Sequence, residues 1–204
     1  MFSLLTRQSA AAVRMLVALT VLLGIAYPLA VWGVAHVPGL AHRAEGSVIT
    51  GADGTPAGSS LIGIDPVAAG PAADPYFHTR PSASSEDVLG PGDPSTSGGS
   101  NQGGFSEDLL AAVEQRRTLI AQREGVPPDQ VPADAVTASA SGVDPGISPE
   151  YAALQVPRVA RVTGLGEERV RELVAASTRG RPLGVLGAPA VDVTELNLAV
   201  AAER

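Results

Sequence analysis

The sequence of 204 residues contains no cysteine, which excludes disulfides, thiol nucleophiles and zinc sites with cysteine ligands. It also contains no lysine, so all 14 basic residues are arginine. The phosphate-binding lysine of a P-loop and any Schiff-base lysine are therefore excluded. We do not expect this chain to hydrolyse ATP by itself.

Aromatic residues are also scarce, at 3% of the chain, which argues against a large aromatic-rich core. The basic residues are outnumbered by 21 acidic ones, and the formal net charge is −7. Because binding to nucleic acid through phosphates requires a basic face, nucleic acid is not an expected partner. The 23 glycines and 17 prolines make up close to a fifth of the residues and predict abundant loops.

One long apolar run occupies residues 15–35, where 21 residues carry no charge. A helix rising about 1.5 Å per residue covers the roughly 30 Å hydrocarbon core over this length. A cleaved signal peptide is the alternative, but its apolar region is usually about 7–15 residues long. The run therefore predicts a retained transmembrane helix. Pro28 is expected to kink this helix or to mark where a neighbouring helix covers its freed carbonyl.

The flanking charges predict the orientation of this helix. Arg7 and Arg14 precede it, whereas Arg43 is the only arginine close behind it. Because cytoplasmic flanks carry the excess of basic residues, we expect residues 1–14 in the cytoplasm and residues 36–204 outside a plasma membrane that the chain crosses once. The extracytoplasmic part has 12 arginines against 21 acidic residues, a formal charge of −9.

The pattern of residues 36–204 predicts a single α+β domain, with a small sheet and helices packed against it. Helices are expected after the caps Ser106, Ser148 and Thr194, and over residues 167–177. The expected strands are residues 47–50, 60–64, 134–139, 183–186 and 190–193, and the expected long loops are residues 65–74 and 81–104. Phe105 and Leu110 have the spacing of a hydrophobic staple at the first of these helices.

The residues that carry out catalysis in common enzymes are sparse. His36, His42 and His78 are the only histidines, and none has a metal-binding spacing, so no metal ligands are predicted. Serines are plentiful, but no Gly-x-Ser-x-Gly motif is present, and no catalytic residue is predicted. Paired carboxylates brought together by the fold would still suit an exported hydrolase. A membrane-anchored hydrolase and a binding module therefore stay open as alternatives.

The most unusual segment is Ser97-Gly98-Gly99-Ser100-Asn101. A glycine-rich loop before a helix can direct several backbone N–H groups at an anion, which makes these five residues a candidate loop for a nucleotide or a partner. The alternative is a tight loop whose serines and Asn101 bond the local backbone. Because no lysine supports the loop and the expected side of the membrane lacks ATP, the tight loop is favoured.

A second run of small and hydroxylated residues covers residues 136–145. Its small side chains allow close approach of the backbone to another loop of the domain or to a partner. Buried hydroxyls here, such as those of Ser139 and Ser141, would need hydrogen-bond partners. Gln155 or Arg158 on the following helix is expected to supply them.

Taken together, these segments resemble the C subunit of the Kdp-type potassium-transporting ATPase over residues 13–200. Their order and spacing behind one N-terminal membrane helix make the resemblance specific. The residues that carry it are Tyr76-Phe77-His78-Thr79-Arg80-Pro81-Ser82, Ser97-Gly98-Gly99-Ser100-Asn101, Val136-Thr137-Ala138-Ser139-Ala140-Ser141-Gly142, Asp144-Pro145, Ile147-Ser148, Gln155-Val156-Pro157-Arg158-Val159-Ala160 and Val193-Thr194-Glu195-Leu196-Asn197.

The resemblance implies a non-catalytic accessory subunit of a high-affinity ATP-driven potassium pump. It implies two partners, a channel-like potassium-binding subunit and a P-type ATPase subunit, and a role in assembly and as a catalytic chaperone that raises ATP affinity. No cofactor of its own is implied, since the complex handles ATP and potassium. The candidate partner-interface residues are Arg80, Ser139, Ser141, Asp144, Gln155 and Arg158. If ATP is cytoplasmic and residues 36–204 lie outside, the effect on ATP affinity is indirect.

Overall fold

The computed structural model describes residues 2–51, 53–70 and 73–204. The chain divides into two compact units, the first ending at Ser47 and the second running from Val48 to Arg204. The predicted 65–74 loop includes residues 71–72, which lie outside the described residues.

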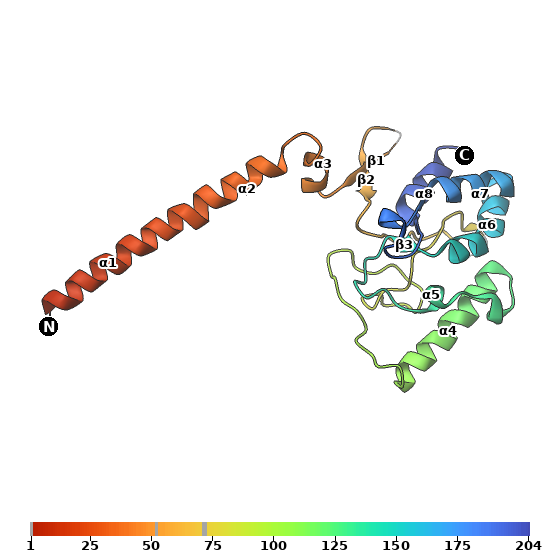
Figure 1. Ribbon diagram of the computed structural model, residues 1–204. Helices are drawn as coiled ribbons and strands as arrows, with labels where there is room; N and C mark the ends of the chain where they lie inside the picture. Colours follow the sequence, from red (N-terminus) through yellow and green to blue (C-terminus); the bar gives the residue numbers. More distant parts are fainter. Residues whose placement is uncertain (1, 52, 71–72) are drawn as a thin grey trace. The chain divides into compact units, whose positions relative to one another are not determined.

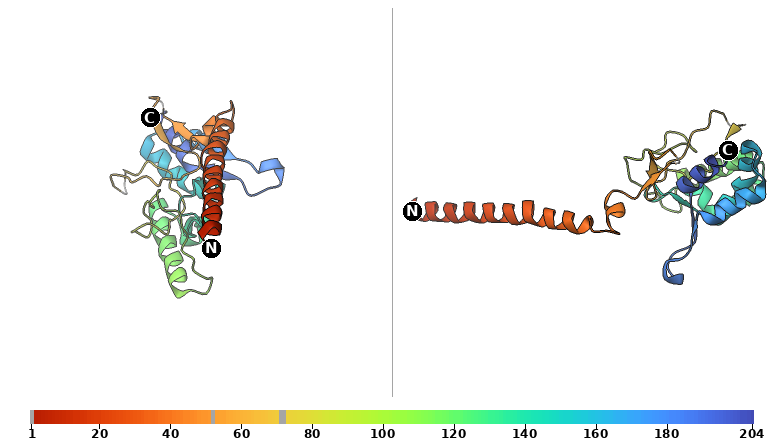
Figure 2. Two further views of the ribbon diagram at one scale, coloured as in Figure 1. Left: turned by 90° about the vertical axis from the view of Figure 1, so that its left-hand side faces the viewer. Right: turned by 90° about the horizontal axis from the view of Figure 1, so that it is seen from above.

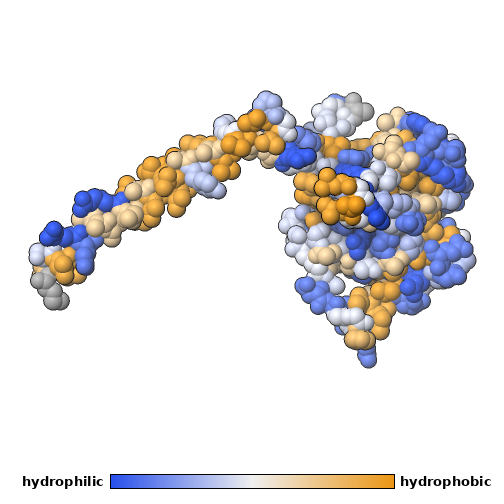
Figure 3. All heavy atoms as spheres, in the orientation of Figure 1, coloured by the Kyte–Doolittle hydropathy of each residue, from blue (hydrophilic) through white to orange (hydrophobic). Residues whose placement is uncertain are grey.

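A single long helix dominates the first unit (Figure 1). It consists of α1 (Phe2–Val21), a π-helical turn η1 (Leu22–Ala26) and α2 (Tyr27–Ala35), and residues 2–34 are all exposed. Over 34 residues it is long and apolar enough to cross a membrane, and Figure 3 shows the apolar side chains along it in orange. The predicted segment 15–35 lies inside this helix.

Pro28 is accommodated by the π-helical turn before it. The Tyr27 N–H donates to the Leu22 carbonyl, five residues back, which widens the helix one residue before the proline. A proline has no N–H and its ring crowds the carbonyl four residues earlier, so a locally wider turn relieves that contact. The predicted disturbance at Pro28 therefore takes the form of a π-helical turn.

The chain after the membrane helix folds back in a short turn of α3 (Ala41–Ala44). His36 closes this turn, because its Nδ1 lies 2.8 Å from the Trp32 carbonyl and its Nε2 lies 3.0 Å from Glu45 Oε1. The His36 ring also packs on the Trp32 ring, with centroids 4.4 Å apart. The hydrogen bond to the Trp32 carbonyl, followed by the one to Glu45, raises the pKa of His36.

The second unit contains helices and two small antiparallel sheets (Figure 1), which confirms the predicted α+β class. One sheet pairs β1 with β2, and the other has the order β3-β5-β4. The strands are β1 (Val48–Thr50), β2 (Pro56–Ser59), β3 (Gly146–Ile147), β4 (Thr178–Arg179) and β5 (Ala190–Asp192). The helices are α4 (Glu107–Glu124), η3 (Pro128–Gln130), α5 (Ala133–Val136), α6 (Pro149–Thr163), α7 (Glu167–Ala176), η4 (Pro182–Gly184) and α8 (Val193–Ala201).

Two of the predicted helix caps are confirmed. The Ser106 hydroxyl accepts from the Leu109 N–H at 3.3 Å, and the Ser148 hydroxyl accepts from the Tyr151 N–H at 3.0 Å. The third was wrong, because α8 begins at Val193, two residues earlier than a cap at Thr194 would allow. Its cap is Asp192, whose Oδ1 accepts from the Glu195 N–H at 2.9 Å. A carboxylate here also faces the positive end of the helix dipole.

Several other local predictions were wrong. Residues 60–64 form no strand, because the chain turns back after Asp53 and pairs through β2 instead, leaving Ile62 in one isolated bridge to Ser59. Residues 134–139 overlap the helical turn α5, which follows Pro132. Residues 183–186 form an exposed turn rather than a strand. The staple is absent, since Phe105 is fully exposed.

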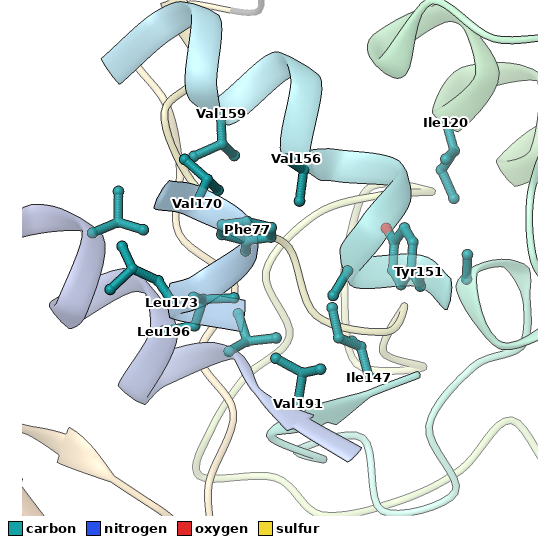
Figure 4. Close-up of a cluster of buried hydrophobic side chains, with 14 of the residues drawn as sticks. Phe77, Ile120, Ile147, Tyr151, Val156, Val159, Val170, Leu173, Val191 and Leu196 are labelled. Carbon is teal, nitrogen blue, oxygen red and sulfur yellow. The ribbon is translucent and has the colours of Figure 1, made fainter. Parts of the chain in front are cut away.

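The core of the second unit gathers around Phe77, which sits in an irregular extended segment (Figure 4). Side chains from α6, α7 and α8 lie around it, and Val191 of β5 belongs to the same cluster beside Ile147. The core also includes Ile120 of α4, and Val170 and Leu173 on one face of α7. Because Phe77 anchors residues 74–80 in this core, the polar groups of that segment need partners inside the domain.

Candidate functional site

Side-chain amides hold the backbone of the segment around Phe77. Asn197 of α8 accepts from the Phe77 N–H and donates to its carbonyl, both at 2.8 Å. Gln155 of α6 makes the same pair of hydrogen bonds with His78, accepting from the His78 N–H at 2.8 Å and donating to the His78 carbonyl at 3.3 Å. Each amide takes the place of a neighbouring strand. The two amides thereby satisfy backbone groups that would be costly to bury unpaired.

Arg158 lies beneath this segment and is 1% exposed. Its Nε donates to Glu124 Oε2 at 2.9 Å, and its Nη1 donates to the carbonyls of Asp74 and Tyr76 at 2.8 and 2.9 Å. Its Nη2 donates to Gln155 Oε1 at 3.1 Å, and the Asp74 carboxylate lies 3.2 Å from Nη1. The guanidinium therefore joins α4, α6 and the irregular segment with charge-assisted hydrogen bonds.

Arg123 of α4, which is partly buried, and the buried Tyr151 of α6 extend this network. Arg123 donates through Nε to Glu124 Oε1 at 2.7 Å and through Nη2 to the Tyr151 hydroxyl at 2.8 Å. Burial raises the pKa of Tyr151, so its phenol stays neutral. Glu124 thus accepts from Arg123 with one oxygen and from Arg158 with the other, which balances its charge inside the domain.

His78 is clamped between two carboxylates. Its Nδ1 lies 3.0 Å from Asp65 Oδ1, and its Nε2 lies 2.7 Å from Asp74 Oδ2. Burial by itself would lower the pKa of His78, but the hydrogen bonds to Asp65 and Asp74 outweigh burial and raise the pKa. Burial likewise would raise the pKa of Asp74, but the bond to His78 and the charges of His78 and Arg158 lower it. The geometry favours an imidazolium that donates from both nitrogens.

We call these seven residues the ionic cluster: Asp65, Asp74, His78, Arg123, Glu124, Tyr151 and Arg158. With His78 protonated, its three cations balance its three carboxylates. A groove of about 1130 Å³ opens beside it, and its lining includes Asp65, His78 and Arg123 together with apolar residues such as Leu89 and Leu119. The groove presents charges of both signs, and it selects no single class of ligand.

The glycine-rich loop lies against the second run of small residues. The Gly98 N–H donates to the Ser141 carbonyl at 2.8 Å, and the Ser97 hydroxyl donates to the same oxygen at 3.0 Å. The Ser139 N–H donates to the Pro81 carbonyl at 2.8 Å. We call this assembly of residues 80–82, 97–101 and 137–145 the loop cluster. One amide of the candidate phosphate cradle, that of Gly98, is therefore already bonded to the chain itself.

Two glycines of the loop cluster are required by close backbone contact. A Cβ on Gly99 would lie 2.9 Å from the Ala140 carbonyl oxygen. A Cβ on Gly142 would lie 2.7 Å from the Gly98 carbonyl oxygen, and Gly142 also has a φ of +76°. Such distances are shorter than van der Waals contact, and a positive φ disfavours any side chain. The glycine-rich composition here reflects packing of backbone on backbone.

Arg80 and Asp144 join the two halves of the loop cluster. Arg80 Nη1 donates to Asp144 Oδ2 at 3.3 Å, and its Nη2 donates to the Thr137 carbonyl at 3.2 Å. The hydroxyls of Ser139 and Ser141 lie 3.1 Å apart and accept from N–H groups of their own loop. The expectation that Gln155 or Arg158 would bond these hydroxyls was therefore wrong, because both are bonded to residues 74–78 or to Glu124 instead.

The structure thus divides the residues singled out in the sequence between two places. Arg80, Ser139, Ser141 and Asp144 lie in the loop cluster, where residues 97–101 are largely exposed. Gln155 and Arg158 are buried and bonded within the domain. A contact with a partner through either of those two would have to be indirect, through residues 74–80.

Sequence reasoning did not find the carboxylates of the ionic cluster or the tie made by Asn197. An arginine on the buried face of a helix needs an acid nearby, and that signal could have shown that Arg158 has an acidic partner, without identifying which one. Asn197 stood in one of the quoted motifs, but its target, the backbone of Phe77, lies 120 residues away.

Comparisons with known proteins cover nearly the whole chain. The family model described as "KdpC: K+-transporting ATPase, c chain" matches residues 9–202. A potassium-transporting ATPase KdpC subunit of Kineococcus radiotolerans is 47% identical over 196 residues, which cover 96% of this chain and 94% of that protein. KdpC subunits of Rhodopseudomonas palustris and Methylorubrum extorquens are 46% and 45% identical, over 93% and 92% of this chain and 94% and 92% of those proteins.

Proposed function

Because this chain belongs to the KdpC family of K+-transporting ATPase c chains, we propose that it is a non-catalytic accessory subunit of a high-affinity, ATP-driven potassium uptake pump. It assembles with a channel-like potassium-binding subunit and a P-type ATPase subunit. The observation that carries this proposal is the family match over residues 9–202, which includes both the membrane helix and the second unit. The resemblance of the quoted motifs supports it.

The proposed topology places residues 1–14 in the cytoplasm, the helix across the plasma membrane, and residues 36–204 outside. Arg7 and Arg14 support it through the excess of positive charge on cytoplasmic flanks. Since the chain lacks cysteine, S3C and A201C variants can be labelled in intact cells with a membrane-impermeant maleimide. We expect labelling at position 201 only. Labelling at position 3 only would show that the chain has the opposite orientation.

The proposed action on ATP affinity is indirect. ATP is cytoplasmic, and the second unit is on the other side of the membrane in this topology. The bond from the Gly98 N–H to Ser141 supports the same reading, because that amide is not free to bind a phosphate. Coupling would then run through the membrane helix and through assembly, and such couplings are typically about 1–3 kcal/mol.

The loop cluster is the proposed docking surface for a partner subunit. It brings Arg80 and Asp144 together with the exposed residues of the 97–101 loop. Close backbone packing and the Arg80 bonds fix its shape before any partner arrives, which lowers the ordering cost of association.

The geometry of His78 supports an accessory role over the alternative of an exported hydrolase. A Ser-His-Asp site needs one ring nitrogen on an acid and the other on a serine. In this chain both nitrogens of His78 lie on carboxylates.

The decisive experiment is potassium-stimulated ATP hydrolysis by the complex with and without this chain, purified in mild detergent after co-expression of the three subunits. We expect co-purification, activity that depends on this chain, and a higher apparent KM for ATP when it is absent or badly docked. Full activity without it, or failure to associate, would reject the accessory role. Turnover of a substrate by this chain alone would instead support an enzyme.

A pair of matched variants tests the docking surface. A140W places a large side chain on the loop cluster, and A153W places the same side chain on the exposed face of α6. We expect A140W to weaken co-purification while A153W leaves it unchanged. Equal effects of the two variants would place the interface elsewhere.

A further inference from the structure

The turn between β4 and β5 exposes a group of aliphatic side chains. Leu183, Val185 and Leu186 are 89%, 75% and 55% exposed. Every residue from 181 to 189 is exposed, and the right-hand view of Figure 2 shows the loop, in blue, extending away from the helices of its unit. We call residues 181–187 the apolar tip. Because exposed aliphatic groups rarely gather without a role, the tip requires an explanation.

The apolar tip has a defined backbone shape. The N–H groups of Gly184 and Leu186 donate to the carbonyls of Arg181 and Pro182 at 2.9 and 3.1 Å. Leu183 adopts a φ of +55° and a ψ of +16°, which costs an L-residue about 1–2 kcal/mol. This strained turn leaves Leu183 exposed in the second unit, so burial there does not offset its cost.

The charge around the apolar tip differs from that of its surroundings. Residues 178–191 contain Arg179 and Arg181 and no acidic residue, although residues 36–204 as a whole are strongly acidic. Arg179 is paired with Asp192 and Glu195. Within the part of the chain that the structure describes, the Arg181 side chain has no hydrogen bond or ion pair. The Arg181 guanidinium can therefore bind an anionic group beside the aliphatic side chains of the tip.

This combination fits a lipid surface better than a protein pocket. Protein interfaces draw most of their energy from Trp, Tyr and Arg in shaped pockets, and Leu and Val are under-represented there. Insertion into a bilayer interface needs only apolar area together with positive charge for anionic headgroups. An arginine next to aliphatic groups can extend to the phosphate level while its stem stays in the apolar region.

The chain itself keeps the second unit close to a bilayer. Residues 36–47 join the membrane helix to Val48, and even a fully extended segment of this length spans only roughly 40 Å. We propose that the apolar tip inserts into the outer leaflet, with Leu183, Val185 and Leu186 at the acyl boundary and Arg181 on an anionic phosphate. The proposal rests on the membrane anchorage included in the proposed function.

Fluorescence quenching in vesicles of phosphatidylcholine and phosphatidylglycerol tests this proposal on the full chain. The absence of native cysteine allows single labels at V185C in the apolar tip and at V67C, a valine of similar exposure, 73%, in another loop. An L23C label in the membrane helix reports anchorage. Spin-labelled lipids quench fluorophores in the bilayer, and iodide quenches those in water.

We expect lipid quenching at positions 23 and 185 and iodide quenching at position 67. Adding the substitutions L183N and L186N to the V185C variant should expose position 185 to quenching by iodide. Omitting phosphatidylglycerol should weaken lipid quenching at the same position. Lipid quenching at 23 but not at 185 would overturn the tip proposal while leaving anchorage intact. No lipid quenching at 23 would overturn anchorage. Protection from both quenchers at 185 in the assembled pump would assign the tip to a protein contact and overturn the lipid assignment.

Discussion

The ionic cluster and the loop cluster both hold irregular backbone in place, but with different groups. In the ionic cluster, Arg158 of α6 bonds the backbone of the 74–80 segment inside the domain, and Glu124 of α4 holds Arg158 in place. In the loop cluster, glycines allow backbone to pack on backbone near the surface, with Arg80 as the main charged tie. One region depends on charges that are already paired, and the other depends on missing Cβ atoms.

This difference determines how each region should respond to change. Removing one charge from a buried, balanced set leaves another charge unpaired in a low-dielectric interior, which is strongly destabilising. Adding a methyl group to a close backbone contact forces a local shift instead. Loss of the ionic cluster should therefore unfold the domain, whereas damage to the loop cluster should alter its surface first.

The largest effect is expected from R158M. It leaves Glu124 and Asp74 without their shared cation and removes donors to two backbone carbonyls. We expect a loss of about 3–5 kcal/mol in the free energy of unfolding, measured by urea unfolding of the full chain in mild detergent. R161M, one turn along the same helix and exposed, is the control and should cost little. Similar losses in the two variants would contradict a special role for the cluster.

A smaller effect is expected from G142A in the loop cluster. The positive φ and the contact with the Gly98 carbonyl together should cost about 1–3 kcal/mol, and the 97–101 loop should move. G98A is the matched control, since a Cβ there meets no atom within 4 Å. Urea unfolding gives the cost, and co-purification with the pump subunits gives the effect on docking. Equal stability of the two variants would argue against close backbone packing.

The pH dependence of stability should separate the two regions further. Because the folded state raises the pKa of His78 above its ordinary value of 6.5, the stabilisation is complete below that value and is lost as pH rises through the folded pKa. The charged and titratable groups facing His78 are Asp65, Asp74 and Arg123. We expect the urea midpoint to fall on the alkaline side of neutrality.

D65N provides the comparison for this pH effect. It keeps an oxygen for the Thr79 N–H but removes one of the two charges that raise the pKa of His78. The fall in the urea midpoint with rising pH should therefore begin at lower pH in this variant. An unchanged profile would show that His78 does not titrate in this range.

The smallest effect concerns potassium and leaves stability unchanged. Glu86 and Asp87 are exposed in the loop that leads into the loop cluster, and their charges would concentrate potassium only within a screening length of about 8 Å. We expect E86Q/D87N to raise the apparent KM for potassium modestly at low salt, as measured by ATP hydrolysis of the complex. E167Q/E168Q on α7 makes the same charge change elsewhere. Equal shifts in both pairs would exclude local steering.

Much of the local structure was predictable because its causes lie within a few residues. The caps at Ser106 and Ser148 act over about one turn of helix. The uncharged run at 15–35 and the glycine-rich 97–101 segment are each continuous along the chain. The same signals failed where a neighbouring residue gave a competing local signal. Asp192 took the place of Thr194 as a cap, and residues 134–139 followed Pro132 into a helical turn instead of a strand.

The sequence by itself determined the membrane helix, the α+β class and the family, because the length of the apolar run, the capping residues and the order of the motifs can all be recognised from residues that are close together in the chain. Only the tertiary structure decided the partners of His78 and Arg158. Asp65 lies 13 residues from His78, and Glu124 and Asp74 lie 34 and 84 residues from Arg158. A local sequence pattern does not show which residues that far apart will meet. Buried charges are paired only when packing brings distant elements together.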